Sequence, residues 1–152
     1  MKQQAYKSLV RPTMEYASSV WDPTTQEDRY KIEMVQRRAA RYVLGRHHNR
    51  SSVTNMIEHL NWRTLEERRR QARLVMMFKM SHNLVNVDTA ANLKTPARRT
   101  RHMHDYYYTQ QRCSTEARRL SFFPRTVRDW NALPAATVSA ESLDQFKALL
   151  TV

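Results

Sequence analysis

Gly45 is the only glycine among the 152 residues of this chain. Average usage of roughly 7% would give about eleven. Loops of the G-x-x-x-x-G-K or G-x-G-x-x-G type need several glycines, because backbone N–H groups must approach a phosphate closely. Tight hairpin turns also take their positive φ mainly from glycine. The chain is therefore excluded from the P-loop and dinucleotide-binding classes, and a hairpin-rich β fold is disfavoured.

Helical periodicity runs through most of the sequence instead. Apolar side chains recur at three- and four-residue spacing, and we expect helices over about residues 3–20, 26–44, 53–60, 64–83 and 124–130, with a last one after Ser139. Residues 85–120 lack this periodicity. The sequence predicts an all-α fold, an irregular domain of about five to six helices. We divide it into a helical region (1–84), an irregular basic arm (85–120) and a C-terminal helical cap (121–152) that packs on the same domain.

Helix ends carry recognisable signals. Gly45 follows the helix 26–44, where a positive φ closes the last turn, and Pro12 should kink or break the first helix. The expected N-caps are hydroxyl side chains: Thr24 or Thr25, Ser51 or Ser52, Thr64 with Glu67 reaching back to it, and Ser139.

The candidate core is aromatic and aliphatic. Residues 74–80 are apolar on almost every side, so we expect this helix to run through the middle of the fold. In the helix 26–44 the apolar face is expected to be Ile32, Val35, Ala39, Tyr42 and Val43, with Arg37 and Arg41 opposite. The large aromatic residues assigned to the core are Trp21, Trp62, Phe122, Phe123 and Trp130.

Arginine supplies nearly all of the positive charge. The chain has 26 Lys and Arg against 14 Asp and Glu, a net charge of +12, and twenty of the 26 are arginine. The guanidinium fork matches phosphate oxygens, so a polyanion, nucleic acid first, is the expected partner. Residues 129–152 are net negative and better suited to packing. The arginines predicted to contact phosphate are Arg37, Arg38, Arg41, Arg68, Arg69, Arg70, Arg73, Arg98, Arg99 and Arg101.

Other readings of these residues stay open. Glu66 and Arg70 form an i,i+4 pair that would leave the arginine on a solvated helix face, although residues 46–80 hold eight bases and three acids. Tyr106, Tyr107 and Tyr108 suit stacking on unpaired bases as well as packing on the core. A merely basic helical protein would share this composition.

No catalytic or metal site stands out. Cys113 has no partner base placed by a motif, and the aspartates are dispersed rather than clustered as two-metal catalysis requires. One cysteine and scattered histidines do not provide the four closely spaced ligands of structural zinc. We therefore expect no enzyme activity, no cofactor, no metal and no small-molecule substrate.

The chain has no apolar run longer than five residues, far short of the roughly twenty that span a bilayer. The first ten residues lack a signal-peptide pattern, and a lone cysteine fits a reducing compartment. We expect an intracellular protein of the nucleus or cytoplasm, with no membrane partner.

Four blocks of sequence resemble, in order, the region after the palm in non-LTR (LINE-type, jockey-like) retrotransposon reverse transcriptases. They are residues 8–23 (SLVRPTMEYASSVWDP), 35–45 (VQRRAARYVLG), 65–70 (LEERRR) and 121–134 (SFFPRTVRDWNALP). The resemblance covers about residues 5–150. It implies that residues 1–84 are thumb-like and that the chain is a fragment or truncated copy of such a polymerase.

In this family the thumb holds the template–primer duplex and the palm transfers nucleotides. The catalytic Tyr/Phe-x-Asp-Asp motif is not among these residues, so the resemblance carries over no catalytic residue. It implies non-catalytic binding of RNA or an RNA/DNA duplex, with the palm and fingers of the parent polymerase as a further partner. The alternatives are a helical protein-interaction module, with Met76, Met77 and Met80 exposed, or a degenerate fragment without function.

Members of the family that the chain resembles often place glycine near the positions of Asn61 and Asn83. Asparagine is the side chain that best tolerates a positive φ after glycine. Part of the glycine deficit is therefore expected to be asparagine at helix ends.

Overall fold

The computed structural model describes residues 1–46 and 52–151, and these are helical or irregular, with no β-strand among them. The all-α prediction is confirmed. The chain forms two compact units, Met1–Arg69 and Arg70–Val152. The boundary falls inside the long helix α6 (Leu65–Ser81) and not near residue 84, because the apolar second half of α6 belongs to the core of the second unit.

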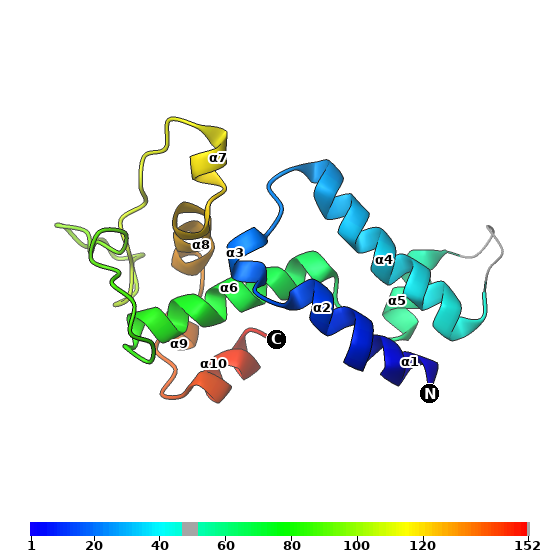
Figure 1. The fold of residues 1–152 in the computed structure, drawn as a ribbon. Coiled ribbons are helices and arrows are strands. Elements are labelled where there is room, and N and C mark those ends of the chain that lie inside the picture. The colour runs from blue at the N-terminus through cyan, green and yellow to red at the C-terminus, as the bar shows by residue number, and fades with distance from the viewer. Residues whose placement is uncertain (47–51, 152) are drawn as a thin grey trace. The chain divides into compact units, whose positions relative to one another are not determined.

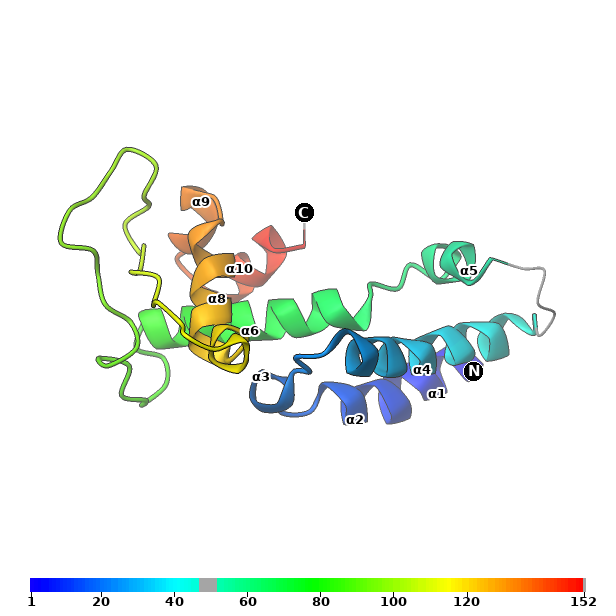
Figure 2. The same ribbon diagram turned by 90° about the horizontal axis from the view of Figure 1, so that it is seen from above.

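The first unit is a set of helices around one small core. In chain order these are α1 (Lys2–Ala5), η1 (Tyr6–Val10), α2 (Arg11–Glu15), α3 (Ser18–Trp21), α4 (Gln26–Leu44), α5 (Val53–His59) and the start of α6. Figures 1 and 2 both show the α1–α2 segment lying alongside α4.

Pro12 does not break the first helix. It occupies the first turn of α2, and the preceding turn, η1, widens into a π-helix. Proline has no backbone N–H, and a residue in the first turn of a helix does not need one for the helical hydrogen bonds. The break comes later, at Ala17, whose φ of 50° separates α2 from α3.

Gln36 decides which face of α4 is buried. Its Nε2 donates to the Arg63 carbonyl at 2.8 Å and its Oε1 accepts from the Tyr6 hydroxyl at 3.3 Å. Burial raises the pKa of Tyr6 to about 12, so this hydroxyl stays protonated as a donor. Tyr6 also stacks on Trp62, with ring centroids 4.5 Å apart.

The apolar face predicted for α4 is therefore wrong in part. Gln36 and Ala40 face the core, whereas Val35 and Tyr42 lie exposed. A polar side chain that satisfies two buried groups has turned the helix away from its most apolar stripe.

Three helices end with the same backbone geometry. Gly45, Asn61 and Asn83 have φ values of 63°, 51° and 54°. In each case the N–H of the following residue donates to a carbonyl of the last helical turn. The three bonds are Arg46 to Arg41 at 3.1 Å, Trp62 to Ile57 at 3.0 Å and Leu84 to Lys79 at 2.8 Å. This is the Schellman ending that favours glycine. The expectation that asparagine stands at helix ends that need a positive φ is confirmed for Asn61 and Asn83.

The N-caps are largely as predicted. Thr25, Ser52 and Thr64 each accept a hydrogen bond from the backbone N–H three residues on, at 3.2, 3.4 and 3.1 Å. Ser51, the alternative to Ser52, lies outside the described residues. The last helix begins later than expected, because Ser142 rather than Ser139 is its N-cap.

In the second unit, α8 (Phe122–Asn131), α9 (Ala135–Val138) and α10 (Leu143–Leu149) pack on the apolar half of α6, and the short helix α7 (Glu116–Arg119) adjoins α8. The core is formed by Leu74, Met77, Phe78, Val127, Trp130 and Phe146, with Tyr108 from the arm. Phe78 stacks on Phe146 at 4.5 Å. The prediction of a buried helix over residues 74–80 is confirmed.

Two of the aromatic core assignments hold fully. Trp62 and Trp130 are buried, and Phe122 and Phe123 are half-buried. Trp21 is exposed, and its indole N–H donates to the Tyr16 carbonyl at 2.6 Å. This hydrogen bond to a residue close in the sequence fixes the indole ring of Trp21 without burying it.

The arm is irregular, as predicted, but α8 holds it in place. Trp130 donates its indole N–H to the Tyr106 carbonyl at 2.8 Å. Asn131 exchanges two hydrogen bonds with the Tyr108 backbone, at 2.8 and 3.1 Å. His104 is buried in the same region, with Nε2 3.4 Å from the Trp130 carbonyl. These contacts favour packing over base stacking for the arm tyrosines, and Tyr106 stacks on His82 at 4.7 Å.

The helix end at Asn61 gives a stability prediction. Replacing Asn61 by Ala should lower the free energy of unfolding by about 1 kcal/mol, because a Cβ without a polar group disfavours the left-handed conformation. Replacing it by Gly should leave stability within a few tenths of that of the wild type. Urea unfolding followed by circular dichroism measures both, and equal losses in the two variants would contradict the proposed role of φ.

His104 makes stability depend on pH. Burial lowers the pKa of this imidazole from its usual 6.5, so below that pH the unfolded chain binds a proton that the folded chain resists. The free energy of unfolding should therefore fall between about pH 7.5 and about pH 5. His104→Gln should reduce this fall, and His59→Gln, at an exposed position, should not. An undiminished fall in His104→Gln, in urea titrations at both pH values, would sink this assignment.

Candidate nucleic-acid interface

The arginines of α6 are held by carboxylates from distant parts of the sequence. In the first unit, Arg68 donates through Nε and Nη2 to the two carboxylate oxygens of Glu15, the second bond being 2.9 Å long. This bidentate pair raises the pKa of Arg68 further. Arg69 donates through Nε to Asp22 at 2.9 Å, and its side chain is only 1% exposed.

The second unit repeats this pattern around Asp129. Arg73, whose side chain is 3% exposed, donates to Asp129 at 3.0 Å, and Arg70 Nε lies 3.8 Å from the same carboxylate. Arg70 is half-buried, at the edge of this cluster.

The phosphate-contact prediction is therefore wrong for Arg69 and Arg73, because both guanidinium groups are buried against carboxylates. Arg68 and Arg70 also have acidic partners. The partner acids lie about fifty positions away in the sequence, so the local count of bases and acids did not reveal them. These four arginines stabilise the two units.

The arginines of α4 have a different environment. Arg38 is exposed, and Arg37 and Arg41 are half-buried. Within residues 1–46 and 52–151, none of the three forms an ion pair. Residues 34–46 hold four arginines and no acid, so this half of α4 is uniformly positive.

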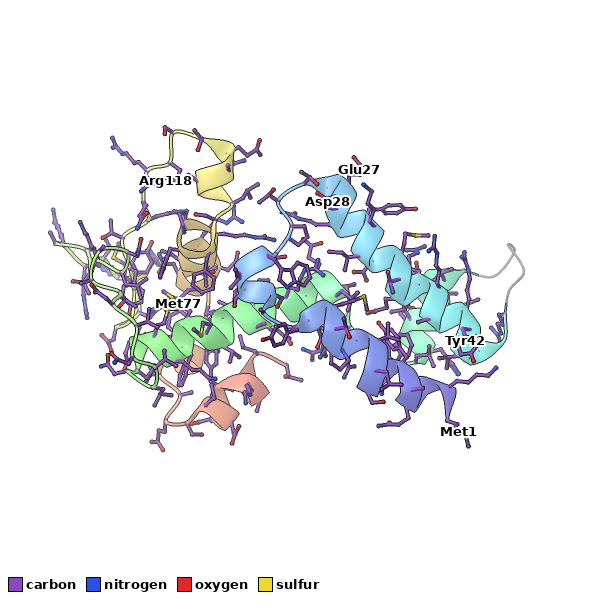
Figure 3. The ribbon with its side chains drawn as sticks, viewed as in Figure 1. Met1, Glu27, Asp28, Tyr42, Met77 and Arg118 are labelled. Carbon is purple, nitrogen blue, oxygen red and sulfur yellow. The ribbon has the colours of Figure 1, made fainter. Side chains whose placement is uncertain are left out.

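One exposed aromatic ring lies on the same half of α4. Tyr42 is 57% exposed, and Lys2 Nζ lies 4.9 Å from its ring centroid. Figure 3 shows Tyr42 near one end of α4, with Glu27 and Asp28 at the other. Lys31 lies 2.7 Å from Glu27, so the acidic end holds its own cation. The positive charge is concentrated on the second half of the helix.

The arm presents a second group of predicted arginines. Arg98 and Arg101 are exposed and form no ion pair within the described part of the chain. Arg99 is also exposed, but it donates to the Asp105 carboxylate and to the Asp105 carbonyl, both at 3.0 Å. Arg98 and Arg101 thus remain available to an anion, and Arg99 would first have to leave Asp105.

The arm also contains cations that were absent from the predicted set. Lys94, Arg112 and Arg118 are exposed, form no ion pair among the described residues, and line a common pocket. The excess of bases over residues 81–128 indicated this region. Only the tertiary structure shows which of those bases lie together.

The difference between the two classes of arginine is measurable. Arg69→Ala should lower the free energy of unfolding by about 3 kcal/mol, because it removes the guanidinium group that pairs with the buried carboxylate of Asp22. Arg38→Ala, at an exposed position, should change it by less than about 0.5 kcal/mol. Urea unfolding of both variants tests this, and similar losses would show that burial does not separate the two groups.

Among the described residues, no helix has the length and apolarity to cross a membrane. In the same residues no three His, Cys, Asp or Glu side chains gather closely enough to hold a metal ion. Comparisons of the chain with models of known families, with curated proteins and with solved structures found no match. The resemblance to retrotransposon reverse transcriptases therefore stays a prediction from the sequence.

Proposed function

We propose that this chain binds nucleic acid without catalysing a reaction, and that arginine–phosphate contacts provide the affinity. The ligand in this proposal is RNA or a template–primer duplex. The resemblance to the thumb region of a non-LTR retrotransposon reverse transcriptase suggests this ligand, and the basic half of α4 supports it.

The observation that carries the proposal is the contrast between α6 and α4. The arginines of α6 have carboxylate partners, whereas Arg37, Arg38 and Arg41 have none among the described residues. One helical turn, about 6 Å, separates Arg37 from Arg41. Three guanidinium groups on one turn can therefore contact neighbouring phosphates, and each neutralised phosphate releases counterions.

A purely structural role explains part of this pattern. A cation near the C-terminal end of a helix interacts favourably with the helix dipole and stabilises the helix by about 0.3–1 kcal/mol. One arginine in the last turn would suffice for that effect, and Arg41 occupies this place. Arg37 and Arg38 lie a turn earlier, so the dipole does not account for them.

Binding of a protein is the second candidate function. The three methionines predicted to be exposed do not provide such a surface, because Met77 and Met80 are buried and Met76 is half-buried. The favouring observation is in the N-terminal segment, where Leu9 is 71% and Val20 is 87% exposed. The resemblance suggests the palm and fingers of a reverse transcriptase as the partner of such a surface.

Replacing Arg37, Arg38 and Arg41 by Gln tests the nucleic-acid proposal. Binding to a primer–template duplex should weaken, and the slope of log K against log salt should become shallower by about two to three, because up to three phosphate contacts are lost. The matched control replaces Lys31, Arg119 and Lys147 by Gln. These exposed cations each pair with an acid on their own helix, so this control loses the same net charge.

Fluorescence anisotropy at several salt concentrations gives both quantities, and circular dichroism confirms that each variant is folded. Equal weakening in the two triple variants would mean that net charge alone attracts the duplex. A folded wild-type chain that fails to bind at low salt would overturn the proposal. Binding of a protein to apolar side chains would lack the steep salt dependence.

A further inference from the structure

Two segments of the arm run beside each other. The Thr109 N–H donates to the Lys94 carbonyl at 2.7 Å, and Gln111 Nε2 donates to the Asn92 carbonyl at 3.1 Å. These bonds fix residues 92–94 against residues 109–111, although the sequence predicts only irregular structure there. Side chains that are about 15 positions apart in the sequence thus share one surface.

This surface contains a pocket of about 500 Å³. Lys94 and Arg112 line it from the two segments, and Arg118 reaches it from α7. Figure 3 shows Arg118 extending from α7 on the side of the arm. The neighbouring acid, Glu116, is engaged by Arg119 at 2.9 Å. The pocket is therefore positive, with no carboxylate among the residues that line it.

Neutral polar groups complete the lining. Gln110 brings a carboxamide and Thr109 a hydroxyl. The carboxamides of Asn92 and Gln111 also line the pocket, and Gln111 Nε2 donates to Asn92 Oδ1 at 3.4 Å. A carboxamide both donates and accepts hydrogen bonds, as the edges of nucleobases do. Cations together with carboxamides fit a ligand that has an anionic end and a neutral end with donors and acceptors. The volume lies within the range of about 300–1,000 Å³ typical of small-ligand sites.

We propose that this pocket binds one nucleotide, with its phosphate held by Lys94, Arg112 and Arg118 and its base against the carboxamides. The inference rests on the proposed function and extends it by naming a second, separate site. Binding at α4 requires only a phosphate backbone. This pocket requires an unpaired base, because a base in a duplex is stacked and hydrogen-bonded within it. The nucleotide is either free or part of a single strand.

Cys113 provides a local readout. It is the only cysteine of the chain, it follows Arg112 directly, and its Sγ lies 3.6 Å from the Gln111 carbonyl oxygen. The rate at which iodoacetamide alkylates this half-buried thiol therefore reports on occupancy of the adjoining pocket.

The experiment measures this rate with three probes: a single-stranded hexanucleotide, the corresponding mononucleotide and the nucleoside without phosphate. The hexanucleotide should slow alkylation and the nucleoside should not. Slowing by the mononucleotide as well identifies a free nucleotide as a sufficient ligand, and slowing by the hexanucleotide alone identifies the strand. Either result supports the proposal. Absence of slowing by both phosphate-bearing probes, or equal slowing by inorganic phosphate, overturns it.

Variants locate the effect. Each single replacement of a pocket cation should raise the probe concentration that halves the alkylation rate. The expected increase is about two- to fivefold, as for exposed ion pairs, and the variants are Lys94→Gln, Arg112→Gln and Arg118→Gln. The control Lys31→Gln/Lys147→Gln removes two exposed cations that do not line the pocket and that each pair with an acid on their own helix, and it should leave this concentration unchanged. An equal increase in this concentration in the pocket variants and in the control would contradict nucleotide binding in the pocket. In the variant with Arg37, Arg38 and Arg41 replaced by Gln, the probe should still slow alkylation of Cys113. This result would show that the pocket binds its ligand independently of the proposed duplex-binding site on α4.

Discussion

Ion pairs between α6 and distant carboxylates are the interactions on which both units of this chain depend. Arg69 with Asp22 in the first unit and Arg73 with Asp129 in the second are buried. Breaking such a pair removes a close counter-charge from a buried group in a medium of low dielectric constant, which costs far more than losing a surface pair. The pairs therefore fix the position of α6 within each unit, and the apolar contacts form around it.

This arrangement divides the arginines by task. Arginines that pair with an acid in the folded chain stabilise the fold. Arginines without such a partner are available to an external anion. Arg37, Arg38 and Arg41 on α4 belong to the second group. A total of 26 lysines and arginines thus overstates the number of groups that a polyanion can reach. The location of the carboxylates, and not the number of arginines, defines the candidate interface.

Local signals in the sequence were informative where the physics is local. The caps at Thr25 and Thr64 and the asparagine endings at Asn61 and Asn83 depend on a few neighbouring residues, and the sequence predicts them. The rotation of α4 was missed because Gln36 is oriented by groups about thirty positions away on either side. The pairing of Arg69 was missed for the same reason. Propensity and periodicity contain no information about such distant partners.

The tryptophans lie in three different settings. Trp62 packs in the core of the first unit, Trp130 packs in the core of the second, and Trp21 is exposed. Indole emission depends on the polarity around the ring, so each core has its own intrinsic fluorophore. In a chain with Trp21 and Trp62 replaced by phenylalanine, the remaining emission would follow the second unit alone. The order in which the two units melt is therefore accessible without any added dye.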